Sequence, residues 1–449
     1  MIIDTTKTQN SLTREQKEAV GLLSIGTFLE YFDLMLYVHM AVLLNELFFP
    51  KYDPFTNSLL TAFAFCSTYL LRPFGALLFG YIGDHIGRKS IVVITTLLMA
   101  FSCFVMAILP TYAQIGITAS WLVTGCRIFQ GMSSMGEFIG AQLYLTEITK
   151  PPIQYPVVAL TAVFSILGGT VALGVATLTT IEGVDINWRY AFAFGSVVAL
   201  VGTIARTTLK ETPDFADAKK RIMSNLNDSQ QQKVKKKNVW TDGSKKDKKT
   251  FFALFILDCG WPVCFYFSYI FCGDILKREF AFTASEVINH NFIVSMVQFA
   301  GVIVLTILSY KIDPPKIVKA KLLLFIIVTL ASPFLITILH NSSTIFFIQC
   351  CFLIFACDYV PAMPITYKHI SVLRRFTYCS MSYALSRSTM SIIISFGLVY
   401  LFQYFSYWGI IIVMTPIIIG YITSVYHFDK LEREARTIVT KRKTRIVVH

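Results

Sequence analysis

Charge is what this sequence has least of. Only 15% of its 449 residues are Asp, Glu, Lys or Arg, whereas 55% are hydrophobic. A soluble chain carries roughly 25% charged residues. Apolar runs of about 20 residues recur along the chain, and such runs are typical of bilayer-spanning helices. The composition therefore excludes an ordinary soluble protein and predicts a membrane protein with many spans.

Motifs of enzymes and secreted proteins are also lacking. The ten cysteines lie in or beside apolar runs without CxxC or Cys/His spacing, which favours buried thiols over disulfides or metal ligands. There is no nucleophile–base motif and no nucleotide-binding loop, so we expect no enzyme, no cofactor and no metal. The first 18 residues are polar and do not resemble a secretory signal. The first apolar run is therefore expected to be a transmembrane helix.

Twelve apolar runs separated by polar breaks are long enough to cross a bilayer, some of them with tilt. An all-α membrane protein with twelve transmembrane helices is therefore expected. The predicted spans are residues 19–47, 55–82, 90–110, 113–146, 155–179, 188–208, 251–274, 286–310, 320–339, 343–365, 377–402 and 405–427.

A polar, strongly basic stretch divides these spans into two sets of six. We expect an N-terminal six-helix bundle over residues 1–208, a cytoplasmic linker over 209–250, and a C-terminal bundle with a cytoplasmic tail over 251–449. Two sets of six suggest an internal repeat. The loops at 80–90 and 309–319 support it, because each places a tyrosine three residues before an aspartate.

The distribution of lysine and arginine predicts the orientation. If both termini are cytoplasmic, 32 of the 40 Lys and Arg residues fall in cytoplasmic segments and three in the opposite loops. Cytoplasmic loops carry such an excess of positive charge. The same asymmetry accounts for the formal net charge of +13. We therefore interpret the linker as a segment close to anionic lipid and expect no nucleic-acid partner.

Eight charged side chains fall inside the predicted spans and away from their ends, where each costs about 2.5–3.5 kcal/mol. Such residues are candidates for ion and substrate pathways, although buried pairs that fix helix register are an alternative. They are Glu30 and Asp33 in span 1, Arg72 in span 2, Arg127 and Glu137 in span 4, Asp258 in span 7, Asp358 in span 10, and Arg387 in span 11.

Two of these spans carry polar stripes at helical spacing. Glu30, Asp33 and Tyr37 lie at positions i, i+3 and i+7 and share one helix face. Such a stripe faces protein or water rather than lipid, and pairing of Glu30 or Asp33 with the arginine of the other stripe is possible. The second stripe consists of Arg127, Gln130, Ser134 and Glu137.

The stretch GYIGDHIGRKS resembles the signature loop of the major facilitator superfamily, which joins helices 2 and 3 on the cytoplasmic side. RIFQG, at 127–131, resembles the helix 4 motif of that superfamily, and KETPDF, at 210–215, resembles its motif after helix 6. The residues that match the signature loop are Gly80, Asp84, Gly87, Arg88 and Lys89.

Residues 20 to 215 are more closely similar to the metabolite:proton symporter family, which includes carriers of proline/glycine betaine, 2-oxoglutarate, citrate and shikimate. The proline/betaine carriers look nearest, and the likeness is faint over 251–449. The resemblance implies two pseudo-symmetric six-helix bundles around a midplane cavity lined by helices 1, 4, 7 and 10. Six of the eight intramembrane charges fall on those spans.

The resemblance also implies a gate. Asp84 is expected to meet the start of helix 11 or nearby basic groups when the carrier faces outward. Alternatively, Asp84 only caps helix 3, and the basic residues after it only enforce orientation. The candidate gating residues are Arg72, Gly80, Asp84, Gly87, Arg88, Lys89 and Arg387.

We therefore expect a monomeric secondary transporter of a bacterial cytoplasmic membrane. It would import a small zwitterionic or carboxylate metabolite with a proton, by alternating access. Glu30 and Asp33 are the candidate proton carriers, and Arg127 would hold a substrate carboxylate. The remaining candidates for the proton and substrate site are Tyr37, Gln130, Glu137, Asp258 and Asp358.

Aromatic side chains of two spans offer ring faces to a quaternary ammonium group. They are Tyr37, Trp261, Tyr266 and Tyr269. Two alternatives stay open. One is a carrier of sugars or drugs. The other is a sensor that binds ligand without transport, because the loop at 309–319 keeps only the aspartate of the signature.

Overall fold

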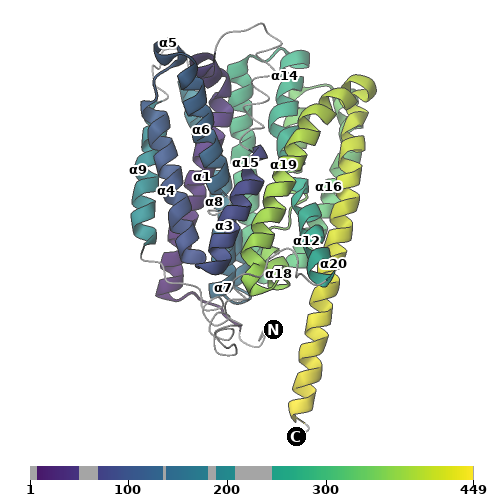
Figure 1. The fold of residues 1–449 in the computed structure, drawn as a ribbon. Coiled ribbons are helices and arrows are strands. Elements are labelled where there is room, and N and C mark those ends of the chain that lie inside the picture. The colour runs from purple at the N-terminus through teal and green to yellow at the C-terminus, as the bar shows by residue number, and fades with distance from the viewer. Residues whose placement is uncertain (1–7, 50–68, 135–137, 181–188, 208–244, 448–449) are drawn as a thin grey trace.

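The structure, a computed structural model, describes residues 8–49, 69–134, 138–180, 189–207 and 245–447. The described segments are helical, with one isolated bridge between Gln9 and Pro152 and no strand. The helices run roughly side by side as a single bundle (Figure 1). Seven of the described helices are long and apolar enough to cross a membrane. This confirms the prediction of an all-α membrane protein.

The N-terminal half contains long apolar helices joined by short polar turns. One such turn lies at Gly87, whose φ of 144° favours glycine, and α4 begins directly after it. The helices are α1 (Arg14–Phe48), α3 (Arg72–His85), α4 (Arg88–Ile108), α5 (Tyr112–Ile115), α6 (Ile117–Ser134), α7 (Gly140–Ile148), α8 (Gln154–Thr180) and α9 (Arg189–Arg206).

The C-terminal half contains more interruptions. The predicted seventh span is divided into four consecutive helical pieces. The third of them, directly before α14, is a π-helix. The elements are α12 (Lys245–Asp258), α13 (Gly260–Phe265), η2 (Tyr266–Phe271), α14 (Cys272–Phe280), α15 (Ala284–Lys311), α16 (Pro314–Leu339), α17 (Ser342–Ile354), α18 (Met363–Lys368), α19 (Val372–Phe405), η3 (Ser406–Trp408) and α20 (Gly409–Val447).

The predicted tenth span is not one helix. Residues 355–362 are non-helical and separate α17 from α18. A hydropathy pattern cannot reveal this break, because the segment is as apolar as a helix. Helix α16 begins at Pro314, six residues before the predicted start of span 9 at residue 320. Lys321, which the charge distribution assigns to a cytoplasmic loop, is 4% exposed and lies two turns inside α16.

The two halves contact each other along two helix pairs. Helix α8 packs against α15, and α3 packs against α19. Gly80 and Gly83 allow the second contact, because a Cβ on either would lie 2.9 Å from Thr377 Cα or from the Phe376 ring. Helices α7 and α18 lie at one end of the bundle, and α5 and α14 lie at the other (Figure 1). The α7/α18 end is the predicted cytoplasmic end.

Candidate functional site

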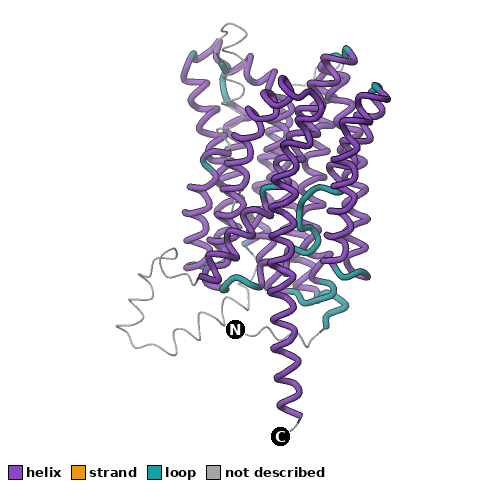
Figure 2. Tube along the Cα trace, turned by 90° about the vertical axis from the view of Figure 1, so that its right-hand side faces the viewer, coloured by secondary structure: helices purple, strands orange, loops and turns teal. Residues whose placement is uncertain are grey.

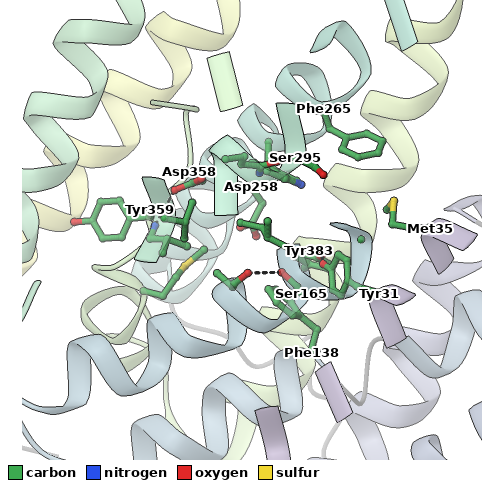
Figure 3. A pocket seen from close by; sticks show the side chains of 18 of the residues that line it. Tyr31, Met35, Phe138, Ser165, Asp258, Phe265, Ser295, Asp358, Tyr359 and Tyr383 are labelled. Atoms are coloured by element: carbon green, nitrogen blue, oxygen red, sulfur yellow. Dashed lines mark hydrogen bonds between the residues drawn. The ribbon is translucent and has the colours of Figure 1, made fainter. Parts of the chain in front are cut away.

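A cavity of about 110 Å³ lies between the two halves. The predicted cavity-lining spans 1, 4, 7 and 10 correspond at the cavity to α1, α7, α12 with α13, and the break after α17. Residues of α8, α15, α16 and α19 also line the cavity. Asp358 and Tyr359 lie across the pocket from Tyr31 and Met35 (Figure 3). Most of the wall is apolar. The charged side chains among the described residues that line it are Asp258, Lys321, Asp358 and Arg387.

A tyrosine pair bridges the halves at the cavity wall. The hydroxyl groups of Tyr31 from α1 and Tyr383 from α19 lie 2.7 Å apart. The guanidinium of Arg387 lies over the Tyr383 ring at 4.5 Å, which is a favourable cation–π geometry. Ser382, on the same helix, donates a 2.8 Å hydrogen bond to Asp258 Oδ2. Helix α19 therefore carries Arg387 and also binds Asp258 on this side of the cavity.

An ion pair forms the opposite part of the charged wall. Lys321 Nζ lies 2.6 Å from Asp358 Oδ1, and the two side chains are 5% and 19% exposed. Asp358 belongs to the non-helical segment 355–362, so its backbone must find partners outside a helix. Tyr421 from α20 supplies one by donating to the carbonyl oxygen of Asp358 over 2.6 Å.

The polar stripes of α1 and α6 form a separate buried cluster. Arg127 donates to Gln130 over 2.8 Å, and both carboxyl groups, of Glu30 and Asp33, are 2% exposed. The Asp33 carboxyl group lies close to the Cys103 thiol and the Arg127 guanidinium. None of these residues is among those that line the larger cavity. Glu137 lies outside the described residues, as does the side chain of Tyr37.

A smaller cavity of about 40 Å³ lies between α3, α13 and α19. Arg72 lines it and places its guanidinium 4.5 Å from the centre of the Tyr69 ring. Arg387 lines it as well. The two arginines predicted on spans 2 and 11 therefore line one cavity, each over a tyrosine ring of its own helix or of the turn before it.

Contacts between the halves gather at the predicted cytoplasmic end. Asp84 accepts hydrogen bonds from the backbone N–H groups of Phe376 (3.2 Å) and Thr377 (2.8 Å) and from the Thr377 hydroxyl (2.6 Å). Glu147 forms a buried 3.1 Å ion pair with Arg375. Asp84 and Glu147 of the N-terminal half thus both bind the first turns of α19.

The rest of the signature loop lies beside these contacts. Gly80 packs on α19, and Gly87 provides the turn into α4. Lys89 is half-buried, and the side chain of Arg88 lies outside the described residues. A further contact joins the halves here, because Tyr367 of α18 donates to Gln142 of α7 over 2.5 Å.

Several polar side chains that the structure brings to the site have little signal in the sequence. Lys321 was hidden by its place in a basic loop pattern. The uncharged polar residues among apolar neighbours carried a weaker signal, yet a buried network connects the π-helix to α15 and α17. The missed residues are Tyr31, Gln142, Asn291, Gln298, Lys321, Gln349 and Tyr383.

Two helical halves around a charged central cavity define a solute carrier. The sequence profile of the Major Facilitator Superfamily matches residues 23–372, and the chain belongs to this family. The structure agrees, since it superimposes on the proton:xylose symporter XylE with a TM-score of 0.71 at 13% identity, covering 92% of this chain and 95% of that one. The protein is therefore a multi-pass membrane protein of this superfamily.

Curated relatives match less than half of the chain. The chain is 33% identical over 204 residues to the proline/betaine transporter of Salmonella typhimurium, covering 44% of this chain and 41% of the relative. It is 35% identical over 207 residues to the inner membrane metabolite transport protein YhjE of Escherichia coli, covering 44% and 47%. The chain thus spans less than half the length of the curated relatives that it matches.

Proposed function

We propose that this transporter is a proton-coupled symporter of a small zwitterionic or carboxylate metabolite in a bacterial cytoplasmic membrane. The names of the relatives support this class, because they include a proline/betaine transporter and an inner membrane metabolite transport protein. The resemblance to XylE supports the fold only, at 13% identity. A sugar is therefore not the favoured substrate.

The observation that carries the proposal is the charge of the cavity wall. Its described lining includes two acids and two bases within a mostly apolar surface. A zwitterion requires both signs of charge at fixed positions, whereas a neutral sugar requires hydrogen-bonding groups. Trp261, Phe265 and Tyr269 also line the cavity, and their rings suit a quaternary ammonium group.

Alternating access would proceed by rocking of the halves about this cavity. The contacts of Asp84 and Glu147 with α19 close the predicted cytoplasmic end. Breaking these contacts would open the cavity on that side. Because the contacts are few, the closed and open states can remain close in free energy, as a transport cycle requires.

Glu30 and Asp33 are the proposed proton carriers in the N-terminal half. Both are buried, Asp33 lies near Arg127, and a carboxyl group in such a place can bind and lose a proton during the cycle. Since they do not line the larger cavity, a proton would act there through the position of α1 and α6 rather than by contact with the substrate.

Uptake by reconstituted liposomes tests the proposal. An inward proton gradient is imposed, and radiolabelled proline, glycine betaine and 2-oxoglutarate are offered in turn. We expect uphill uptake of at least one, lost with an uncoupler and with Asp33→Asn. Asp274→Asn is the matched control, because that carboxyl group is exposed near a helix end.

Other outcomes separate the alternatives. Uptake of xylose but of none of the three metabolites would show that the substrate class is wrong. Binding without uptake would identify a sensor. Uptake that survives both the uncoupler and Asp33→Asn would contradict proton coupling through this cluster while leaving the substrate assignment intact.

A further inference from the structure

Lys321 is a buried ammonium group at the cavity wall. Its Nζ donates to Asp358 Oδ1 over 2.6 Å and to the carbonyl oxygen of Val360 over 3.3 Å. An ammonium group has three donors, so these two acceptors leave one for a ligand in the cavity. A desolvated cation favours an anionic partner over a neutral one. The third donor is therefore suited to a carboxylate.

Asp358 uses only one of its two carboxylate oxygens. Oδ1 accepts from Lys321 and from the backbone N–H of Val360 at 3.1 Å. Within the part of the chain that the structure describes, no donor reaches Oδ2. The side chain is 19% exposed and lines the cavity. Oδ2 can therefore receive a proton while Oδ1 keeps its hydrogen bond to Lys321.

The break between α17 and α18 holds both groups in place. Residues 355–362 leave backbone carbonyls without helical partners, and Tyr421 and Lys321 bind two of them. Irregular backbone at membrane depth is tolerated where it lines a cavity, and carriers use discontinuous helices to build ligand sites. The broken segment and the ion pair therefore form one preorganised site.

The other cavity cation, Arg387, belongs to α19, at the other part of the charged wall. Its guanidinium lies over the Tyr383 ring. The second acid of the cavity, Asp258, accepts a hydrogen bond from Ser382. The remaining ionisable neighbours of the Lys321–Asp358 pair carry hydroxyl and thiol groups, which are uncharged when protonated. They are Tyr421 from α20, Cys264 from α13, and Cys357 and Tyr359 from the broken segment.

We propose that Lys321 binds the carboxylate of the transported metabolite and that Asp358 takes up one proton as it binds. This inference rests on the proposed function. The cationic group of a zwitterionic metabolite would lie against the rings of Trp261, Phe265 and Tyr269 in the same cavity.

Around Lys321, one ammonium between two carboxylates then leaves a local negative charge in a low-dielectric site. A proton on Asp358 Oδ2 restores neutrality there. After the metabolite leaves, the proton dissociates and the ion pair forms again, so Asp358 carries one proton with each carboxylate, apart from any proton that Glu30 or Asp33 carries.

Four variants test this site in liposomes with radiolabelled glycine betaine. Two transport modes are measured, namely accumulation driven by a proton gradient and counterflow without one. The matched control is Lys319→Met, two residues away on the same helix, because Lys319 is half-exposed and pairs with Asp429 outside the cavity. The test variants are Lys321→Met, Asp358→Asn and the double variant, each checked for folding by size-exclusion chromatography.

We expect Lys321→Met to lower both modes by about tenfold or more, as a lost charge-assisted bond does. Asp358→Asn resembles the protonated acid, so counterflow should stay within about twofold while accumulation is lost. The double variant should behave like Lys321→Met, and Lys319→Met like the unmodified protein.

Restoration of both modes in the double variant would overturn the inference, because a purely structural ion pair tolerates neutral replacement of both partners. Loss of counterflow in a folded Asp358→Asn variant would overturn it as well, independently of how Lys321→Met folds. Failure of the unmodified protein to transport glycine betaine, proline or 2-oxoglutarate would instead overturn the proposed function, and this assignment with it.

Discussion

Asp84 concentrates three hydrogen bonds on one carboxylate. Two donors are backbone N–H groups in the first turns of α19 and the third is the Thr377 hydroxyl. The positive end of the helix dipole adds to this attraction. The pseudo-symmetric Asp313 begins α16 without a side-chain hydrogen bond to it. The two halves therefore differ in how a single aspartate is used.

Replacing Asp84 by alanine should loosen the predicted cytoplasmic end. Loss of hydrogen bonds to a charged group costs about 1.5–3 kcal/mol, which shifts an opening equilibrium by roughly tenfold or more. Hydrogen–deuterium exchange should rise in α18 and at the start of α19. Asp313→Ala is the control and should leave exchange there unchanged. Equal protection in the two variants would show that Asp84 does not hold this end closed.

Individual charged residues were predictable to the extent that they interrupt apolar runs. Asp258, Asp358 and Arg387 stand out in this way, and they line the cavity. Lys321 did not, because three other basic residues lie within ten positions before it and mark the same stretch as a loop. Pairing across the fold is a tertiary property, so its ion pair with Asp358 has no signal in the local sequence.

At the scale of elements, the broken tenth span is the clearest departure from a simple helix. Gly260, at the start of α13, lies so close to Cys357 that a Cβ would overlap its carbonyl oxygen. Two interrupted spans therefore meet backbone to backbone. Small residues allow such close approach in membranes. The sequence shows the glycine but not its contact with the other interrupted span.

Gly260→Ala should therefore destabilise the C-terminal half. A methyl group there must displace backbone, and overpacking of this kind costs about 1–3 kcal/mol. Thermal unfolding in detergent should occur at a lower temperature than in the unmodified protein. Gly397→Ala in α19 is the matched control, since a Cβ there meets nothing within 4 Å. Unfolding of both variants at the unmodified temperature would contradict the close contact.

The whole molecule was largely predictable because its solvent is a bilayer. Hydropathy defines the spans, and the helical class follows since backbone groups in lipid must bond within a segment. What hydropathy does not record is depth within a span. The position of the break at 355–362 and of the Asp33 cluster outside the cavity depends on side-chain packing between spans.

Orientation is the whole-molecule prediction that the charge distribution makes. Both termini are expected in the cytoplasm. A green fluorescent protein fused after residue 449 should fluoresce, whereas alkaline phosphatase at the same place should be inactive. The same phosphatase fused within residues 48–54, which contain Lys51 and join the first two predicted spans, should be active. The opposite pattern would reverse the topology.

Helix α20 continues far beyond the bundle (Figures 1 and 2). Its 39 residues extend about 58 Å at 1.5 Å per residue, roughly twice the thickness of the hydrocarbon layer. A rod of this kind magnifies angles. If the C-terminal half rocks by roughly 10°, a tip about 30 Å from the bundle moves by about 5 Å. A spectroscopic label at the tip would therefore report the rocking of the C-terminal half in each transport cycle.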